Sequence, residues 1–139
     1  MKRTLVRAGT ARKAFLGVVL TLVFANYCYA QELTASFYTV SGLHRDGQWK
    51  ITKGLCADGK TIFRDEGYTS ACNSFKRGVQ LRVTDLQSGR SVVVRNTDKT
   101  NRRFTGKRID LSRQSFITLV GSEQDLKKGL LKVRVEYER

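Results

Sequence analysis

The sequence is poor in the residues that build metal centres. Among its 139 residues it has no proline, one histidine and three cysteines. One histidine and three cysteines cannot supply two cysteines with two histidines, or four cysteines, which excludes the two common kinds of structural zinc site. There is also no internal repeat, heptad pattern or low-complexity linker. We therefore expect neither a metal nor a cofactor, and a chain of this length suits one ordinary domain.

Positive charge, in contrast, is abundant. The 26 lysines and arginines outnumber the 12 aspartates and glutamates and give a net charge of +14. Hydrophobic residues make up 40% and aromatic residues 9% of the chain, which is too much for a disordered basic tail. On composition alone, such a charge suggests binding to nucleic acid or to a membrane surface.

The N-terminal segment differs from the rest of the chain. Met1–Lys13 carries basic residues and no acidic one, and Ala14–Ala25 is an uncharged apolar run. Cys28 and Ala30 follow as small residues at the −3 and −1 positions. A basic region, an apolar region of about a dozen residues and small residues at these two positions are typical of a secretory signal peptide. We predict a signal peptide over residues 1–30, cleaved after Ala30.

A membrane anchor and a lipid anchor are the alternatives for this segment. The apolar run is shorter than the roughly 18–20 residues that span a bilayer, which favours cleavage over an anchor. Lipidation of Cys28 is disfavoured because the bulky Tyr27 stands where a lipoprotein signal has a small residue. We therefore predict export to the periplasm or the extracellular space.

Removal of this leader changes both the charge and the cysteine count. The domain predicted over residues 31–139 has a net charge of +9 and two cysteines, Cys56 and Cys72. An even number of cysteines in a small exported domain favours a disulfide. Closing a loop of about fifteen residues would stabilise the fold by roughly 3 kcal/mol. The alternative is a pair of buried free thiols.

Most of the remaining chain has the pattern of short strands. Thr34–Val40 is rich in β-branched and aromatic residues. Val79–Thr84 alternates, a Gln-Ser-Gly turn signal follows, and Ser91–Arg95 is the next strand, which predicts a hairpin over residues 79–95. Leu131–Tyr137 alternates apolar and charged residues without interruption. Between them, residues 112–120 predict a short helix that ends at Gly121. Several short strands with one short helix indicate a small β-barrel.

Short motifs along the chain follow a recognisable order. They are Ala35-Ser36-Phe37-Tyr38, Ala57-Asp58-Gly59, Thr69-Ser70-Ala71, Gly78–Thr84, Gly89–Asp98, Arg108–Ser112 and Val133–Glu136. In this order they resemble the RlpA-like double-psi β-barrel family, which shares its fold with expansins and barwin. The resemblance covers residues 34–137. It implies a mainly-β, six-stranded double-psi barrel with one or two short helices.

The resemblance also implies an activity. RlpA-like proteins are peptidoglycan lytic transglycosylases, in which a Glu after a Gly, a His that ends a Thr-Ala-Ala-His motif and an Asp in an Asn-Asp-Arg-Gly-Pro loop are tied to cleavage. Lytic transglycosylation protonates the glycosidic oxygen and uses a base on the sugar's own hydroxyl, which gives an anhydro product without water. A carboxyl group with a raised pKa is the usual acid.

This chain matches the family's catalytic pattern only in part. Lys60 stands at the position of the Glu, and an ammonium group is a poor acid at neutral pH. The His position falls at Cys72 or Asn73, and neither is a good proton shuttle. Glu66 lies shortly after Lys60 and could fill the vacancy. The Asp position is kept as Asp98, although the Arg-Gly-Pro that follows it in the family is absent.

Asp98 and Asp110 are the two candidate catalytic residues that the resemblance keeps. Asp110 matches an Asp that serves as the groove acid in distant relatives that cleave glycans. Its alternative role is to cap the helix over residues 112–120, and the alternative for Asp98 is an ordinary turn residue. If they form one site, both side chains should open onto one groove.

The candidate glycan-binding residues surround these two aspartates. They are Tyr38, Arg95, Lys60, Asn73 and Arg103. Tyr38 could equally pack in the core, and Arg95 could pair with Asp98 rather than hold a glycan oxygen. The segment between Asp98 and Asp110 is densely basic, which for an exported protein favours an anionic envelope polymer over nucleic acid as a further partner.

The sequence therefore predicts an exported monomer that acts on peptidoglycan glycan strands, as an endolytic lytic transglycosylase with an altered acid site. Two alternatives use the same barrel. One is a non-catalytic, expansin-like module that binds the cell wall, and the other is a secreted effector that uses the barrel as a stable scaffold.

Overall fold

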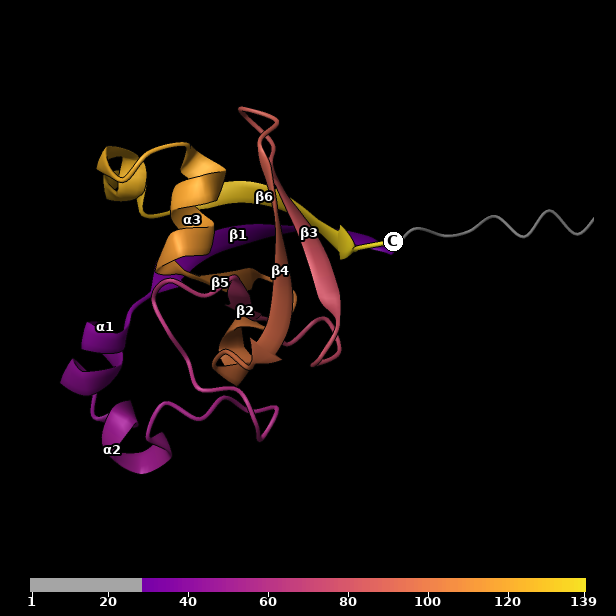
Figure 1. Cartoon of the computed structure of the whole chain (residues 1–139). Helices are drawn as coiled ribbons and strands as arrows, with labels where there is room; N and C mark the ends of the chain where they lie inside the picture. The colour runs from indigo at the N-terminus through magenta and orange to yellow at the C-terminus, as the bar shows by residue number, and fades with distance from the viewer. Residues whose placement is uncertain (1–28) are drawn as a thin grey trace, which may run out of the picture.

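A computed structural model describes residues 29–139 of the chain. The predicted leader lies outside the described residues, Cys28 included, except for its last two residues, Tyr29 and Ala30. The described chain forms strands and short helices around one barrel (Figure 1). In chain order they are β1 (Ala30–Tyr38), α1 (Val40–Arg45), α2 (Gln48–Thr52), β2 (Thr69–Ala71), β3 (Gln80–Asp85), β4 (Ser91–Asp98), η1 (Arg102–Phe104), β5 (Arg108–Ser112), α3 (Arg113–Val120), η2 (Gln124–Lys128) and β6 (Leu131–Tyr137).

The six strands close into a barrel in the order β1-β5-β2-β4-β3-β6. The pairs β1–β5 and β2–β4 are parallel, and the other four pairs are antiparallel. The first and last strands close the ring, since Ala30 of β1 stands opposite Glu136 of β6. Closure removes the free strand edges that would otherwise invite pairing with another chain. The fold is the small, mainly-β double-psi barrel that the sequence predicts.

Alternating side chains from the strands fill the barrel. Leu81 and Val83 of β3, and Val133 and Val135 of β6, point inward and are fully buried. One end is covered by α3, which packs against β1, β3, β4 and β5. Its Phe116 is fully buried in the same core. The buried apolar surface therefore runs without a break from the strands to the helix.

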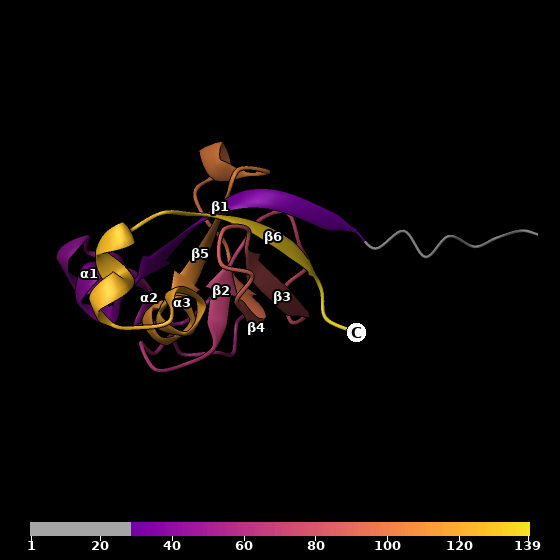
Figure 2. The ribbon, with the colours of Figure 1, turned by 90° about the horizontal axis from the view of Figure 1, so that it is seen from above.

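The predicted hairpin and the predicted final strand are confirmed, as β3–β4 and β6. The predicted helix begins at Arg113 and ends before Gly121, as the sequence indicated. Two further helices, α1 and α2, were not predicted from the sequence. Figure 2, viewed from above, shows them on the side of the barrel away from the C-terminus, as in Figure 1. No helix among residues 29–139 is long and apolar enough to cross a membrane.

Candidate active site

A row of four residues crosses four neighbouring strands. Ser36 of β1 stands opposite Asp110 of β5, and Asp110 also stands opposite Ala71 of β2. On its other side, Ala71 stands opposite Asp98, the last residue of β4. Because neighbouring strands lie about 4.8 Å apart, the backbones of the two aspartates are roughly 10 Å apart. The register of β2 on β4 shifts at Ala71, an irregularity that is common beside active sites.

Asp98 and Asp110 line the same groove, which has a volume of about 540 Å³. One wall comes from α1, α2 and the segment that follows α2, and the other from residues 99–104. The aromatic rings of Tyr38 and Phe63 stack between these walls, with 4.1 Å between their centroids. A groove with two carboxyl groups and apolar ring surfaces can hold a sugar chain and exchange protons with it.

Asp110 is a partly buried carboxyl group with a raised pKa. Burial raises the pKa of Asp110, and a hydrogen bond from the Ser36 hydroxyl and the positive charge of Arg108 oppose that shift only in part. A carboxyl group of this kind keeps its proton to a higher pH than an exposed aspartate. Asp110 does not cap α3, because the hydroxyl of Ser112 accepts the hydrogen bond from the amide of Ser115. Its side chain is therefore available to the groove.

Asp98 sits in a different environment at the end of β4. Its Oδ1 accepts hydrogen bonds from the backbone amides of Ala57, at 3.0 Å, and Lys99, at 2.9 Å. The first of these bonds ties the loop after α2 to the barrel across the groove. Asp98 therefore meets the groove with a carboxyl group fixed by backbone amides, whereas Asp110 meets it with a buried carboxyl group.

Tyr38 brings a buried hydroxyl to the same place. Burial raises the pKa of Tyr38, and the nearby carboxyl groups of Asp98 and Asp110 add to the shift. Thr69 lies beside this hydroxyl, but no residue among 29–139 partners the oxygen in hydrogen-bond geometry. A buried polar atom without a partner is rare and costly. The Tyr38 hydroxyl is therefore enclosed beside Thr69, and the residue as a whole lines the groove.

Asn73 holds the basic wall of the groove in place. Its Oδ1 accepts from the amide of Thr100 at 3.0 Å, and its Nδ2 donates to the carbonyl of Thr100 and to the hydroxyl of Thr105, both at 3.1 Å. On the same wall, the guanidinium groups of Arg103 and Arg108 lie 4.6 and 4.1 Å from the ring centroid of Phe104. The predicted glycan-binding residue Asn73 thus holds the segment of Thr100 and Thr105 in place.

The remaining predicted site residues lie outside the groove. Lys60 and Glu66 are exposed and do not line it. Arg95 is exposed and donates to the carbonyl of Gly78 at 3.0 Å instead of pairing with Asp98. Arg103 reaches the groove only through its contact with Phe104.

The predicted Cys56–Cys72 disulfide is absent from the structure, where both cysteines are buried free thiols. The two cysteine side chains lie in different surroundings. The thiol of Cys72 lies in the barrel core and donates to the carbonyl of Arg108 at 3.7 Å. Cys56 lies outside that core cluster and interacts with the side chain of Thr97. The alternative that the sequence left open, two buried thiols, is the one that the structure contains.

Sequence reasoning missed much of the groove lining. Asp46, between α1 and α2, adds a third carboxylate to its rim, and Leu43 and Phe104 add apolar surface. The signal that could have found Asp46 is its place in a polar, Gly-bounded loop, but nothing local shows that this loop folds back over the barrel. Among residues 29–139, no group of three His, Cys, Asp or Glu side chains could hold a metal ion.

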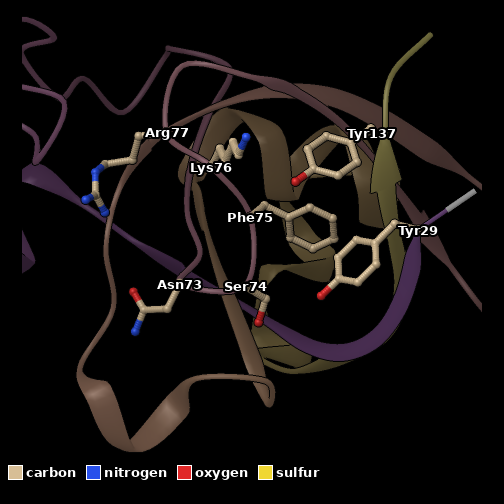
Figure 3. Close-up of a pocket in the computed structure, with 7 residues that line it drawn as sticks. All are labelled: Tyr29, Asn73, Ser74, Phe75, Lys76, Arg77 and Tyr137. Atoms are coloured by element: carbon tan, nitrogen blue, oxygen red, sulfur yellow. The ribbon is translucent and has the colours of Figure 1, made fainter.

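A second hollow lies apart from the two aspartates (Figure 3). It has a volume of about 610 Å³ and is lined by residues 73–77 together with Tyr29 and Tyr137. In this view the rings of Tyr29, Phe75 and Tyr137 gather on one side, and Asn73 and Arg77 point to the other. Through its hydrogen bonds to Thr100, Asn73 also contacts the basic wall of the groove.

Neither protein-family models nor curated protein sequences match this chain, but solved structures do. The Streptomyces papain inhibitor is 21% identical with a TM-score of 0.57, over 80% of this chain and 96% of its own. An expansin from Clavibacter michiganensis is 19% identical with a TM-score of 0.55, over 80% of this chain and 51% of the expansin, so this chain spans about half its length. Cerato-platanin 3 from M. perniciosa is 12% identical with a TM-score of 0.53, over 78% of this chain and 94% of its own.

A likeness at these low identities is a likeness of fold. It establishes the barrel architecture independently of the motifs, because these proteins share little sequence with the chain. The protein is a small double-psi β-barrel of the kind found in expansins, cerato-platanins and the papain inhibitor.

Proposed function

We propose that the protein is exported and cleaves peptidoglycan glycan strands as a lytic transglycosylase, with Asp110 in place of the missing family Glu. The observation that carries this proposal is the cross-strand row that sets Asp110 and Asp98 on one groove. Export is inferred from the leader sequence. The motifs that resemble RlpA-like proteins support peptidoglycan as the substrate.

Asp110 is the proton donor in this proposal. The glycosidic oxygen is a weak leaving group, so it must be protonated as the bond to the anomeric carbon breaks. Burial keeps the proton on Asp110 to a higher pH than on an exposed aspartate. The hydroxyl of Ser36 holds the carboxyl group in position through its hydrogen bond to Oδ1.

Asp98 is the base. It removes the proton from a hydroxyl of the same sugar, whose oxygen then bonds to the anomeric carbon and closes an anhydro ring. One C–O bond breaks and one forms, no water is consumed, and the net result is a proton moved from Asp110 to Asp98. Exchange with solvent returns both groups to their starting states. The ring of Tyr38, which stacks on Phe63 and lines the groove, packs on a sugar face and orients the strand.

Glycan binding without cleavage is the second candidate function. It is favoured by Lys60, which stands where the family has its Glu and lies on an exposed loop away from the groove. A variant of the Clavibacter michiganensis expansin has a solved structure in complex with cellohexaose, and it has a TM-score of 0.54 to this chain. A protein that contains this fold thus binds a sugar chain, and the second candidate function requires binding alone.

The test is incubation of the purified protein with peptidoglycan sacculi, followed by mass analysis of the soluble products. We expect anhydro-ended fragments from the wild type, and a loss of at least about a hundredfold in Asp110→Asn and in Asp98→Asn. Glu66→Gln is the matched control, because Glu66 is a carboxylate that lies outside the groove. Its release rate should equal that of the wild type.

The outcomes separate the candidates. If the protein pellets with sacculi and releases nothing, the binding module is right and the catalytic proposal is wrong. If it neither pellets nor releases fragments, peptidoglycan is not the ligand and the secreted effector becomes the better explanation. Equal loss in Glu66→Gln and Asp110→Asn would show that the groove is not the reacting site.

A further inference from the structure

The hollow in Figure 3 differs from the groove in the charged residues that line it. Asp46, Asp98 and Asp110 line the groove together with Lys99. None of the described side chains that line the second hollow is a carboxylate, and Lys76 and Arg77 form its rim. Neither of these two cations forms an ion pair within residues 29–139. The second hollow is therefore suited to a ligand that carries negative charge.

Aromatic rings form the rest of this hollow. The ring of Phe75 meets Tyr29 and Tyr137 edge to face, with centroids 5.3 and 5.1 Å away. Phe75 is anchored in the core with 5% of its surface exposed, whereas 47% of Tyr29 is exposed. Exposed ring faces next to free cations can pack on the flat C–H face of a sugar while the cations hold its acid group.

Hydrogen bonds to Asn96 hold in place the loop that carries Lys76 and Arg77. The fully buried Asn96 donates from Nδ2 to the backbone carbonyls of Cys72, Phe75 and Lys76, each at 3.1 Å. The amide of Gly78 donates back to the carbonyl of Asn96 at 2.7 Å. The loop that presents the two cations therefore needs little ordering when a ligand binds, which favours affinity.

We propose that this hollow is a second binding site, for an acidic sugar unit of an anionic polysaccharide. Arg77 and Lys76 bind its carboxylate, and the half-buried ring of Tyr137 packs on the sugar. The site does not depend on Tyr29, which precedes the predicted cleavage point, because Tyr137 and both cations follow it in the chain. It is separate from the proposed cleavage, since neither groove aspartate lines it.

The test uses tetragalacturonate and its methyl ester, which share one skeleton and differ in charge. With the protein recovered from expression of the full chain, titration calorimetry should give binding of the acid and at least about tenfold weaker binding of the ester. Amide shifts in an NMR titration should concentrate at residues 73–77 and 137. Shifts that concentrate at residues 98 and 110 would overturn the proposal, as would equal binding of acid and ester.

Charge-matched variants separate a built site from general attraction. The double variant Lys76→Gln/Arg77→Gln should lose at least about tenfold in affinity for the acid. Lys60→Gln/Arg64→Gln removes the same charge from exposed positions that line neither hollow, and it should bind like the wild type. Equal losses in the two double variants would show long-range attraction only, and equal affinity for inorganic polyphosphate would refute the sugar assignment. Asp110→Asn should leave this binding unchanged.

Discussion

At the scale of single residues, the groove shows how one side-chain type acquires two chemistries. Asp98 is the last residue of β4 and accepts hydrogen bonds from two backbone amides. Asp110 lies within the cross-strand row of four residues, where burial raises its pKa. The chain supplies no glutamate or histidine to this groove among residues 29–139. The division of roles that we propose between proton donor and acceptor therefore depends on where each aspartate lies in the barrel.

Asp110→Asn should change the pH dependence of stability. The pKa of Asp110 is higher in the folded than in the unfolded chain. Its contribution to folding stability is therefore complete below the pKa of the unfolded chain and is lost as the pH rises through the pKa of the folded chain. Asparagine keeps an acceptor for Ser36 and cannot ionise. The variant should therefore gain stability relative to the wild type as pH increases from about 4 to 7. The gain is about 1.4 kcal/mol for each tenfold difference in proton affinity between the folded and unfolded chain.

Urea unfolding of both proteins across this pH range measures the difference. Asp125→Asn is a control of opposite sign, because the hydroxyl of Ser122 holds the pKa of that exposed carboxyl below its usual range. A stability difference for Asp110→Asn that does not grow with pH would contradict burial of the carboxyl group.

At the scale of elements, strands whose pattern is local could be predicted from the sequence. Strands β3 and β6 alternate apolar and polar residues, β4 contains a run of three valines, and a Gln-Ser-Gly turn marks the hairpin β3–β4. The helix α1 has no such pattern and is short. At its start, the hydroxyl of Thr39 accepts a hydrogen bond from the amide of Gly42. The amide of Val40 donates a second hydrogen bond to the side chain of Asp65, which is distant in the chain. Partners of that kind cannot be read from the neighbouring sequence.

Ser112→Ala should destabilise the joint between β5 and α3. The Ser112 hydroxyl donates to the carbonyl of Gly67 and accepts from the amide of Ser115, so it caps the helix and also ties down the loop before β2. Loss of a cap costs about 1 kcal/mol, and the unpaired carbonyl adds about 1–3 kcal/mol.

Thermal unfolding measures the cost of this change. Ser88→Ala is a suitable comparison, because Ser88 makes its side-chain hydrogen bonds within the exposed turn between β3 and β4. It should cost less than Ser112→Ala. An equal cost for the two variants would argue against a joint held by Ser112.

At the scale of the whole molecule, the candidate site is made by closure of the barrel. The motifs pointed to Asp98 and Asp110 separately, and only the order of strands β1-β5-β2-β4 places them in one row. Asp46 and Phe104 were missed because they reach the groove from loops whose course depends on that closure. The predicted disulfide failed for the same kind of reason, since an even count of cysteines does not say where each thiol points.

Both thiols should stay unreactive until the molecule unfolds. Burial raises the pKa of Cys56 to about 11 and also raises the pKa of Cys72, so little thiolate is present at neutral pH. Iodoacetamide should label both Cys56 and Cys72 in denaturant without any reductant, and label them slowly in the folded protein. Mass spectrometry counts the labels. A sample that takes up labels only after reduction would show that the two cysteines are bonded.

The pairing of Ala30 with Glu136 brings the two ends of the folded chain to one pole of the barrel, and α1 and α2 lie at the other (Figures 1 and 2). A linker or a solid support attached at either end therefore leaves the groove facing away from the point of attachment. The hollow of Tyr29 and Tyr137 adjoins those ends. On a sensor surface, coupling through a terminus would leave the groove accessible and crowd the hollow of Tyr137. Coupling through a side chain near α2 would do the reverse.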